Sequence, residues 1–126
     1  GIIGRGSRGV WLPNIIEKFL RNDSVRIYSP DFATRNFVWN DDLAKFVTHL
    51  LYMDTWKYDV VCLASHEKTT VRELVHEIKR LTGSASEILV DNDMRAPFCL
   101  DDSRAMEMGY ESISPMEMVQ RMCACA

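Results

Sequence analysis

The residues best suited to chemistry stand in the ten positions that begin at Arg35. This arginine precedes a short apolar pair, Phe37 and Val38, and the double aspartate of Asp41 and Asp42. A guanidinium is planar and pairs with two phosphate oxygens at once. The apolar pair favours a short strand, and one of the aspartates is expected to cap the next helix by accepting backbone N–H bonds. The stretch therefore favours a phosphate-binding arginine placed just before a strand and a helix.

Histidine and cysteine spacing predicts no metal site. The histidines, at positions 49, 66 and 76, share no ligand spacing, and only Cys123 and Cys125 are close among the four cysteines. C-x-C without further ligands is not a zinc motif. We expect free thiols, as in a reducing cytoplasm, and we expect a cytoplasmic protein.

Length and charge narrow the class of protein. With 126 residues, the chain is long enough for one domain with its own core, which we take as residues 1–126. The net charge of −3 does not favour nucleic acid or an anionic membrane, so an anion site would depend on locally placed arginines. No apolar run approaches the roughly 20 residues of a membrane helix.

Apolar spacing and capping signals predict an α/β fold in the order αββαβαβαα. The clearest signal is a capping box from Thr70 to Glu73, followed by Gly83 as a helix stop. The apolar run from Tyr58 to Ala64 predicts a strand covered on both faces. The other expected helices are 11–21, 42–53, one from Asp101 or Asp102 to 109, and 115–123, the last behind a second capping box at Ser114; the other expected strands are 25–28, 37–39 and 88–90.

A glycine-rich segment leaves one alternative open. Gly4 to Gly9 spells G-x-G-x-x-G, and a predicted helix, a strand and Asp31 follow it, in outline like a dinucleotide-binding βαβ unit. The strand before it is short, and bulky residues follow the third glycine. We therefore favour a connecting segment and keep a dinucleotide-binding unit as the second alternative.

Five segments, taken in order, resemble the extended short-chain dehydrogenase/reductase (SDR) family of NAD-dependent nucleotide-sugar epimerases and dehydratases. The ten positions from Arg35 resemble its R-D-F-[VI]-[HY]-V-x-D-[VL]-A signature. The others are G-I-I-G-R-G at the start with the later W-L-P, V-R-I-Y at 25–28, T-V-R-E-L at 70–74, and L-D-D-S-R-A with G-Y at 100–110. By this resemblance, the chain is the C-terminal substrate-binding part of a Rossmann-type protein, a fragment whose N-terminal Rossmann part is missing.

The resemblance also implies where catalysis lies. Enzymes of this family bind NAD or NADP in the Rossmann part, which carries a catalytic Y-x-x-x-K motif. None of the four tyrosines of this chain has lysine four positions later, so we expect no catalytic residue and no bound cofactor here. The partners it implies are a nucleotide-sugar and the missing Rossmann part, and it allows a homodimer.

Four residues are substrate-site candidates by this resemblance. Arg35 would grip the diphosphate, with Arg95 as a second clamp, Tyr28 would stack on or border the base, and Asn14 would contact phosphate or sugar. Phe98 stands where UDP-galactose epimerases have an acidic residue that meets the ribose, so the substrate is left open. The first alternative function is a noncatalytic binding or scaffold module that keeps the SDR fold.

Overall fold

The computed structural model describes residues 1–91 and 97–126 as an α/β fold with three small two-stranded sheets. Two of the sheets are parallel and one is antiparallel. The elements in chain order are β1 (Ile2–Ile3), α1 (Trp11–Leu20), β2 (Val25–Tyr28), β3 (Ala33–Thr34), β4 (Val38–Trp39), α2 (Asn40–Leu51), β5 (Thr69–Thr70), α3 (Val71–Thr82), β6 (Ile88–Asp91), α4 (Ser103–Glu107) and α5 (Pro115–Ala124).

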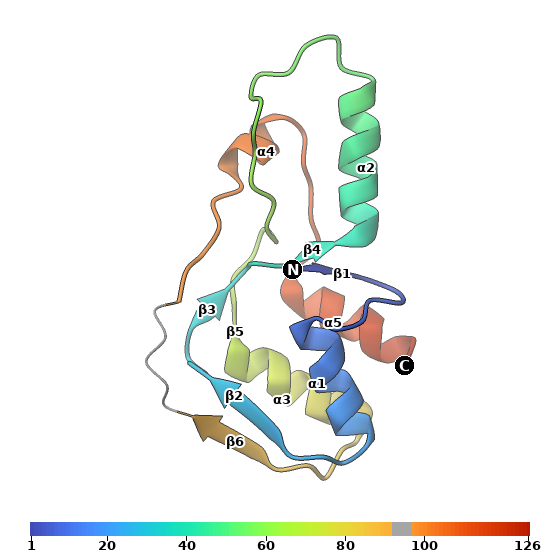
Figure 1. Ribbon diagram of the computed structural model, residues 1–126, viewed down its shortest axis with the longest axis vertical. Coiled ribbons are helices and arrows are strands. Elements are labelled where there is room, and N and C mark those ends of the chain that lie inside the picture. The colour runs from blue at the N-terminus through green and yellow to red at the C-terminus, as the bar shows by residue number, and fades with distance from the viewer. Residues whose placement is uncertain (92–96) are drawn as a thin grey trace.

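The main core lies between the β2–β6 sheet and helices α1, α3 and α5, which pack together in the lower part of Figure 1. Strands β2 and β6 are parallel, with Val25 opposite Ile88 and Tyr28 opposite Asp91. Val25 and Ile27 are fully buried, while the alternate residues of β2 are exposed, as expected for a sheet covered on one face. The helices contribute a further set of buried side chains: Leu12, Ile15, Ile16, Phe19, Leu74, Val75, Ile78, Met118 and Val119.

Helix α3 begins and ends where its sequence signals predict. The Thr70 hydroxyl accepts a bond from the Glu73 backbone N–H at 3.1 Å, and the Glu73 carboxylate accepts one from the Thr70 N–H at 2.8 Å. Gly83 ends the helix at φ +64°, a left-handed conformation that favours glycine. At α5, the Ser114 hydroxyl caps Glu117 N–H, but the Glu117 carboxylate pairs with Arg121.

A second, smaller core joins α2 and α4 at the other end of the molecule (Figure 1). Phe46 packs edge-on against Tyr110 with ring centroids 5.3 Å apart, and Ala105 and Met108 complete the cluster. In the segment from Tyr58 to Ala64, three partly buried side chains pack against this cluster: Tyr58, Val61 and Leu63.

Residues 58–64 are not the buried strand that their apolar run predicts. The run forms no ladder with another strand in the described part of the chain, and Val60 is 75% exposed. A strand needs a hydrogen-bonded neighbour, so composition alone did not decide its structure. The observed order also differs from αββαβαβαα, because β1, β3 and β5 are short strands that the prediction lacks.

Asp42 has a different role from the predicted helix cap. Its side chain is buried and accepts a hydrogen bond from the backbone N–H of Ile113 at 2.9 Å. The helix begins at Asn40 instead, behind Trp39, whose side chain makes no capping bond. Asp42 therefore connects α2 to the segment before α5. In the described residues, no helix has the length and apolar character needed to cross a bilayer.

Candidate functional site

Tyr28 lies at the carboxyl end of β2 and borders an apolar hollow of about 290 Å³, which we call the Tyr28 pocket. Ligands of α/β proteins bind at the carboxyl ends of parallel strands. Tyr28 is 42% exposed, and the rings of Trp11 and Phe37 are stacked, with centroids 6.1 Å apart and an interplanar angle of 16°. A planar aromatic ligand matches such surfaces by stacking. The pocket is lined by Trp11, Tyr28, Phe32, Thr34, Phe37 and Val71.

Arg35 forms an ion pair with Asp102, the residue just before α4. The arginine side chain is 16% exposed and the aspartate side chain 3%, so the pair is largely removed from solvent. In the described part of the chain, Arg35 Nε and Asp102 Oδ2 have no hydrogen-bond partner. The backbone carbonyl of Arg35 accepts bonds from Ser65 N–H at 2.8 Å and from its hydroxyl at 2.9 Å.

The surroundings of Arg35 are rich in negative charge. Asp101, next to Asp102 and exposed, accepts a hydrogen bond from the Ser103 N–H at 3.0 Å. That bond lowers the pKa of Asp101, and the positive charges of Arg35 and Arg104 contribute less. Arg35 therefore faces one buried and one exposed carboxylate. The prediction that it binds phosphate remains a prediction, but its charge already has a partner.

The sequence identified Asp101 and Asp102 as a helix start and as part of a segment that resembles the SDR family, but it assigned neither of them to a contact with Arg35. Asp102 lies 67 positions after Arg35, and a single sequence holds no signal that pairs them. The contact arises because residues 97–100 run beside residues 33–36. The Asn36 side chain joins the two segments through two hydrogen bonds. Its amide NH2 donates to the Phe98 carbonyl at 2.6 Å, and its oxygen accepts from the Leu100 N–H at 2.8 Å.

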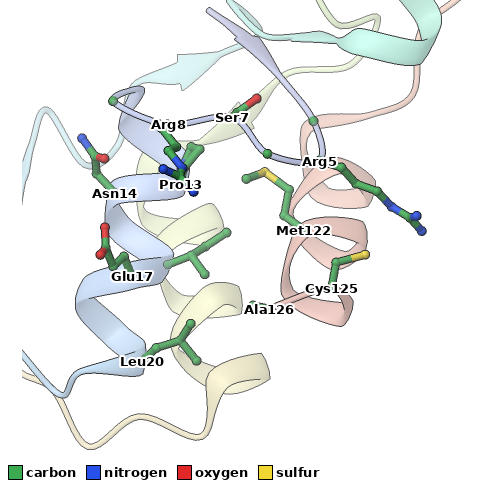
Figure 2. Close-up of a pocket in the computed structure, with 14 residues that line it drawn as sticks. Arg5, Ser7, Arg8, Pro13, Asn14, Glu17, Leu20, Met122, Cys125 and Ala126 are labelled. Carbon is green, nitrogen blue, oxygen red and sulfur yellow. The ribbon is translucent and has the colours of Figure 1, made fainter.

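Of the other two predicted site residues, the structure describes only Asn14, and this residue does not line the Tyr28 pocket. Arg95 lies outside the described residues. Asn14 borders a separate hollow of about 510 Å³ between the glycine-rich segment, α1 and the end of α5. In Figure 2, the Arg5 side chain extends away from α1, and Asn14 lies on the opposite side of this hollow. Asn14 and Tyr28 therefore line different hollows.

The glycine-rich segment is not part of a βαβ unit. Strand β1 before it pairs with β4, whereas β2 after α1 pairs with β6. A dinucleotide-binding unit would place these two strands in one parallel sheet. Gly6 and Gly9 adopt φ values of +78° and +73°, so both glycines serve the turns of a connecting segment.

A third hollow, of about 250 Å³, is lined by Asp102, Tyr110 and four neighbours. Burial raises the pKa of Tyr110 to about 12, and the negative charge of Asp42 acts in the same direction. Tyr110 therefore keeps its proton at neutral pH. No group of three or more histidine, cysteine or acidic side chains among residues 1–91 and 97–126 could hold a metal ion.

No protein-family model matches the chain. It is 30% identical over 110 residues to a protein named "Putative UDP-glucose 4-epimerase" from Methanocaldococcus jannaschii. This match covers 85% of the chain and 35% of the relative, so the chain spans about a third of that protein's length.

Solved structures share the fold at lower identity. A UDP-glucose 4-epimerase from Thermotoga maritima, solved with UDP-glucose, is 23% identical with a TM-score of 0.69, over 99% of this chain and 44% of that one. A UDP-glucuronic acid 4-epimerase from Bacillus cereus, with UDP-glucuronic acid and NAD, is 15% identical with a TM-score of 0.78, over 98% and 41%. A GDP-mannoheptose C4 reductase from Campylobacter jejuni, with NADP, is 15% identical with a TM-score of 0.74, over 100% and 48%.

Proposed function

Because this chain matches a part of the extended SDR family in sequence and in fold, we propose that it is the substrate-binding portion of a longer NAD(P)-dependent nucleotide-sugar epimerase, dehydratase or reductase. The observation that carries the proposal is the Tyr28 pocket. It combines an apolar, aromatic lining with a position at the carboxyl end of a parallel strand.

The base of the nucleotide fits the Tyr28 pocket by shape and chemistry. A base is flat and has a π-face on each side, and stacking on one aromatic side chain contributes about 1–3 kcal/mol. Trp11, Tyr28 and Phe37 offer such faces in one hollow. Their apolar lining does not select among bases, so the proposal extends to nucleoside diphosphate sugars in general.

Arg35 is the proposed contact for the diphosphate. It lies in sequence between Thr34 and Phe37, which line the pocket, so a diphosphate attached to a base there would lie near this segment. A guanidinium binds phosphate oxygens through two parallel N–H bonds. Arg95 remains the proposed second clamp, and Asn14 a contact for a more distant part of the substrate.

The rest of the enzyme is proposed to complete the sheet that β1 and β4 begin. Parallel sheets are usually buried on both faces, yet β1–β4 has two strands, and Ile2 is 55% exposed. Helix α2 follows β4 directly and exposes Val47 by 46% and Leu51 by 75%. Further parallel strands packed on this helix would bury these side chains, as in a Rossmann part.

In the proposed enzyme, the nicotinamide cofactor supplies hydride transfer and is held by the Rossmann part. The residues of this chain bind the nucleotide and orient the sugar toward that part. Orientation alone is a large contribution to rate, because it removes most of the entropy cost of bringing reactants together.

Titration of the full-length protein with UDP and with UDP-glucose, followed by tryptophan fluorescence, tests the proposal. Tyr28→Ala should raise both dissociation constants by about 5- to 150-fold, the equivalent of 1–3 kcal/mol. Tyr52→Ala is the matched control, since Tyr52 is 86% exposed and lies after α2, away from the pocket. Equal binding by the wild type and the Tyr28 variant would reject the assignment of this pocket.

The Arg35–Asp102 pair favours one second candidate, a noncatalytic module that kept the fold. In such a module, an arginine neutralised by a buried carboxylate would serve stability rather than substrate binding. Failure of the full-length protein to bind any nucleotide-sugar, together with a normal melting curve, would favour this candidate.

A further inference from the structure

The backbones of Arg35 and Asp102 are both held by hydrogen bonds, but only the Arg35 side chain keeps appreciable contact with solvent. The Asp102 carbonyl accepts the first helical bond of α4, from Met106 at 3.0 Å, and the Asp102 side chain is 3% exposed. Arg35 is held through its carbonyl by Ser65. Its longer side chain keeps 16% of its surface exposed, and several rotatable bonds connect its planar guanidinium to the backbone. We therefore take the guanidinium as the partner that can reorient and the carboxylate as the fixed one.

The pairing is also incomplete. A bidentate pair between arginine and a carboxylate engages two N–H groups and both oxygens. Here the ion pair joins Nη2 to Oδ1, while Arg35 Nε and Asp102 Oδ2 are buried without a hydrogen-bond partner in the described residues. A buried polar group without a partner costs free energy. A diphosphate, which presents several charged oxygens, would give the guanidinium a more complete set of acceptors.

The guanidinium faces the start of α4 and not the Tyr28 pocket. Thr34 and Phe37 line that pocket, but Arg35 between them does not. Diphosphate binding next to the pocket therefore requires Arg35 to weaken its contact with Asp102. In addition, the fixed negative charge of Asp102 repels an incoming diphosphate.

We infer that Asp102 sets the affinity of the site for diphosphates, by competing with the ligand for the Arg35 guanidinium. The inference rests on the proposed function, because it assumes that Arg35 meets a diphosphate. It makes Asp102 a specificity-determining residue that touches the binding group and not the ligand. Removing its charge should strengthen the binding of a charged nucleotide and leave a neutral nucleoside unaffected.

The test is calorimetric titration of the full-length protein with UDP and with uridine. Asp102→Asn, which keeps the shape of the side chain, should lower the dissociation constant of UDP by about tenfold and leave that of uridine unchanged. Asp23→Asn, at an exposed site after α1, is the control for net charge and should change neither. The Arg35→Gln/Asp102→Asn double variant should lose the gain, because the guanidinium that binds the diphosphate is absent.

Unchanged or weaker UDP binding by a folded Asp102→Asn variant would overturn the inference. If that variant does not fold, the wild type offers a second measurement. The NMR signal of the Arg35 Nε–H group can be assigned because it is lost in Arg35→Lys. Its chemical shift should change when UDP saturates the protein, and an unchanged chemical shift would also overturn the inference. The proposed function fails separately, when the wild type binds no nucleotide or when Tyr28→Ala has no effect.

Discussion

The buried Arg35–Asp102 pair should stabilise the fold through a coupling that an exposed ion pair does not have. The perturbation is a double-mutant cycle made of Arg35→Gln, Asp102→Asn and the double variant. Each single change leaves one buried charge without its partner, because the two side chains are only 16% and 3% exposed. Removing one member of a buried pair typically destabilises a protein by about 3–5 kcal/mol. Since the arginine keeps some contact with water, we expect about 2–4 kcal/mol for each single variant.

The double variant replaces both charges by neutral groups of similar shape, so it should cost less than the sum of the single variants. The expected coupling energy is about 2 kcal/mol or more, within the range measured for residues in direct contact. Urea unfolding of the 126-residue chain, followed by tryptophan fluorescence, measures it. Trp39 is suited to this assay because it is 4% exposed in the folded chain.

The Arg26–Asp91 pair provides the matched control. It joins two neighbouring strands at 3.2 Å, but its side chains are 55% and 36% exposed. Exposed pairs typically contribute about 0–1 kcal/mol, because water and salt screen them. If the Arg35–Asp102 coupling is no larger than that of the control pair, the argument from burial is refuted.

Two further predictions concern stability. Thr70→Ala removes the hydroxyl that caps the Glu73 N–H, so it should lower the free energy of unfolding by about 1 kcal/mol and reduce the melting temperature. The control, Thr55→Ala in an exposed loop, should change neither quantity. Equal losses in the two variants would contradict the role of the cap. Burial and Asp42 raise the pKa of Tyr110 to about 12, above its unfolded value of 10, so its contribution is complete below pH 10 and is lost as pH rises toward 12. Between pH 10 and pH 12, the free energy of unfolding of Tyr110→Phe should therefore fall by about 1–2 kcal/mol less than that of the wild type. An equal fall in both proteins would show that Tyr110 does not cause the loss of stability at alkaline pH.

Signals contained within a few residues were predictable from the sequence. The capping box joins Thr70 to Glu73, three positions later, and Gly83 stops the helix 13 positions after Thr70. Val25 to Tyr28 alternates buried and exposed side chains, as its strand prediction requires. Tyr28 ends that strand and borders an aromatic hollow, but the residues that line the hollow with it could not be identified from its position before a turn.

Features that depend on distant partners were not predictable. The apolar run from Tyr58 to Ala64 has the composition of a strand, but no described strand pairs with it. Asp42 carries a helix-start signal, and yet its carboxylate bonds Ile113, 71 positions away. Asp102 likewise becomes the counter-ion of Arg35 only because the chain returns past residues 33–36.

The glycine-rich segment illustrates why pairing outweighs pattern. Its six residues satisfy the dinucleotide fingerprint, and a helix and a strand follow at suitable distances. The fingerprint has its physical meaning only when the strands on both sides of the helix lie in one sheet, because this arrangement aims the helix N-terminus at the ligand. Here β1 joins β4 while β2 joins β6, so α1 connects strands of two different sheets and packs mainly on α3. Its Trp11 instead lines the Tyr28 pocket, so this helix contributes a stacking surface to the proposed base site.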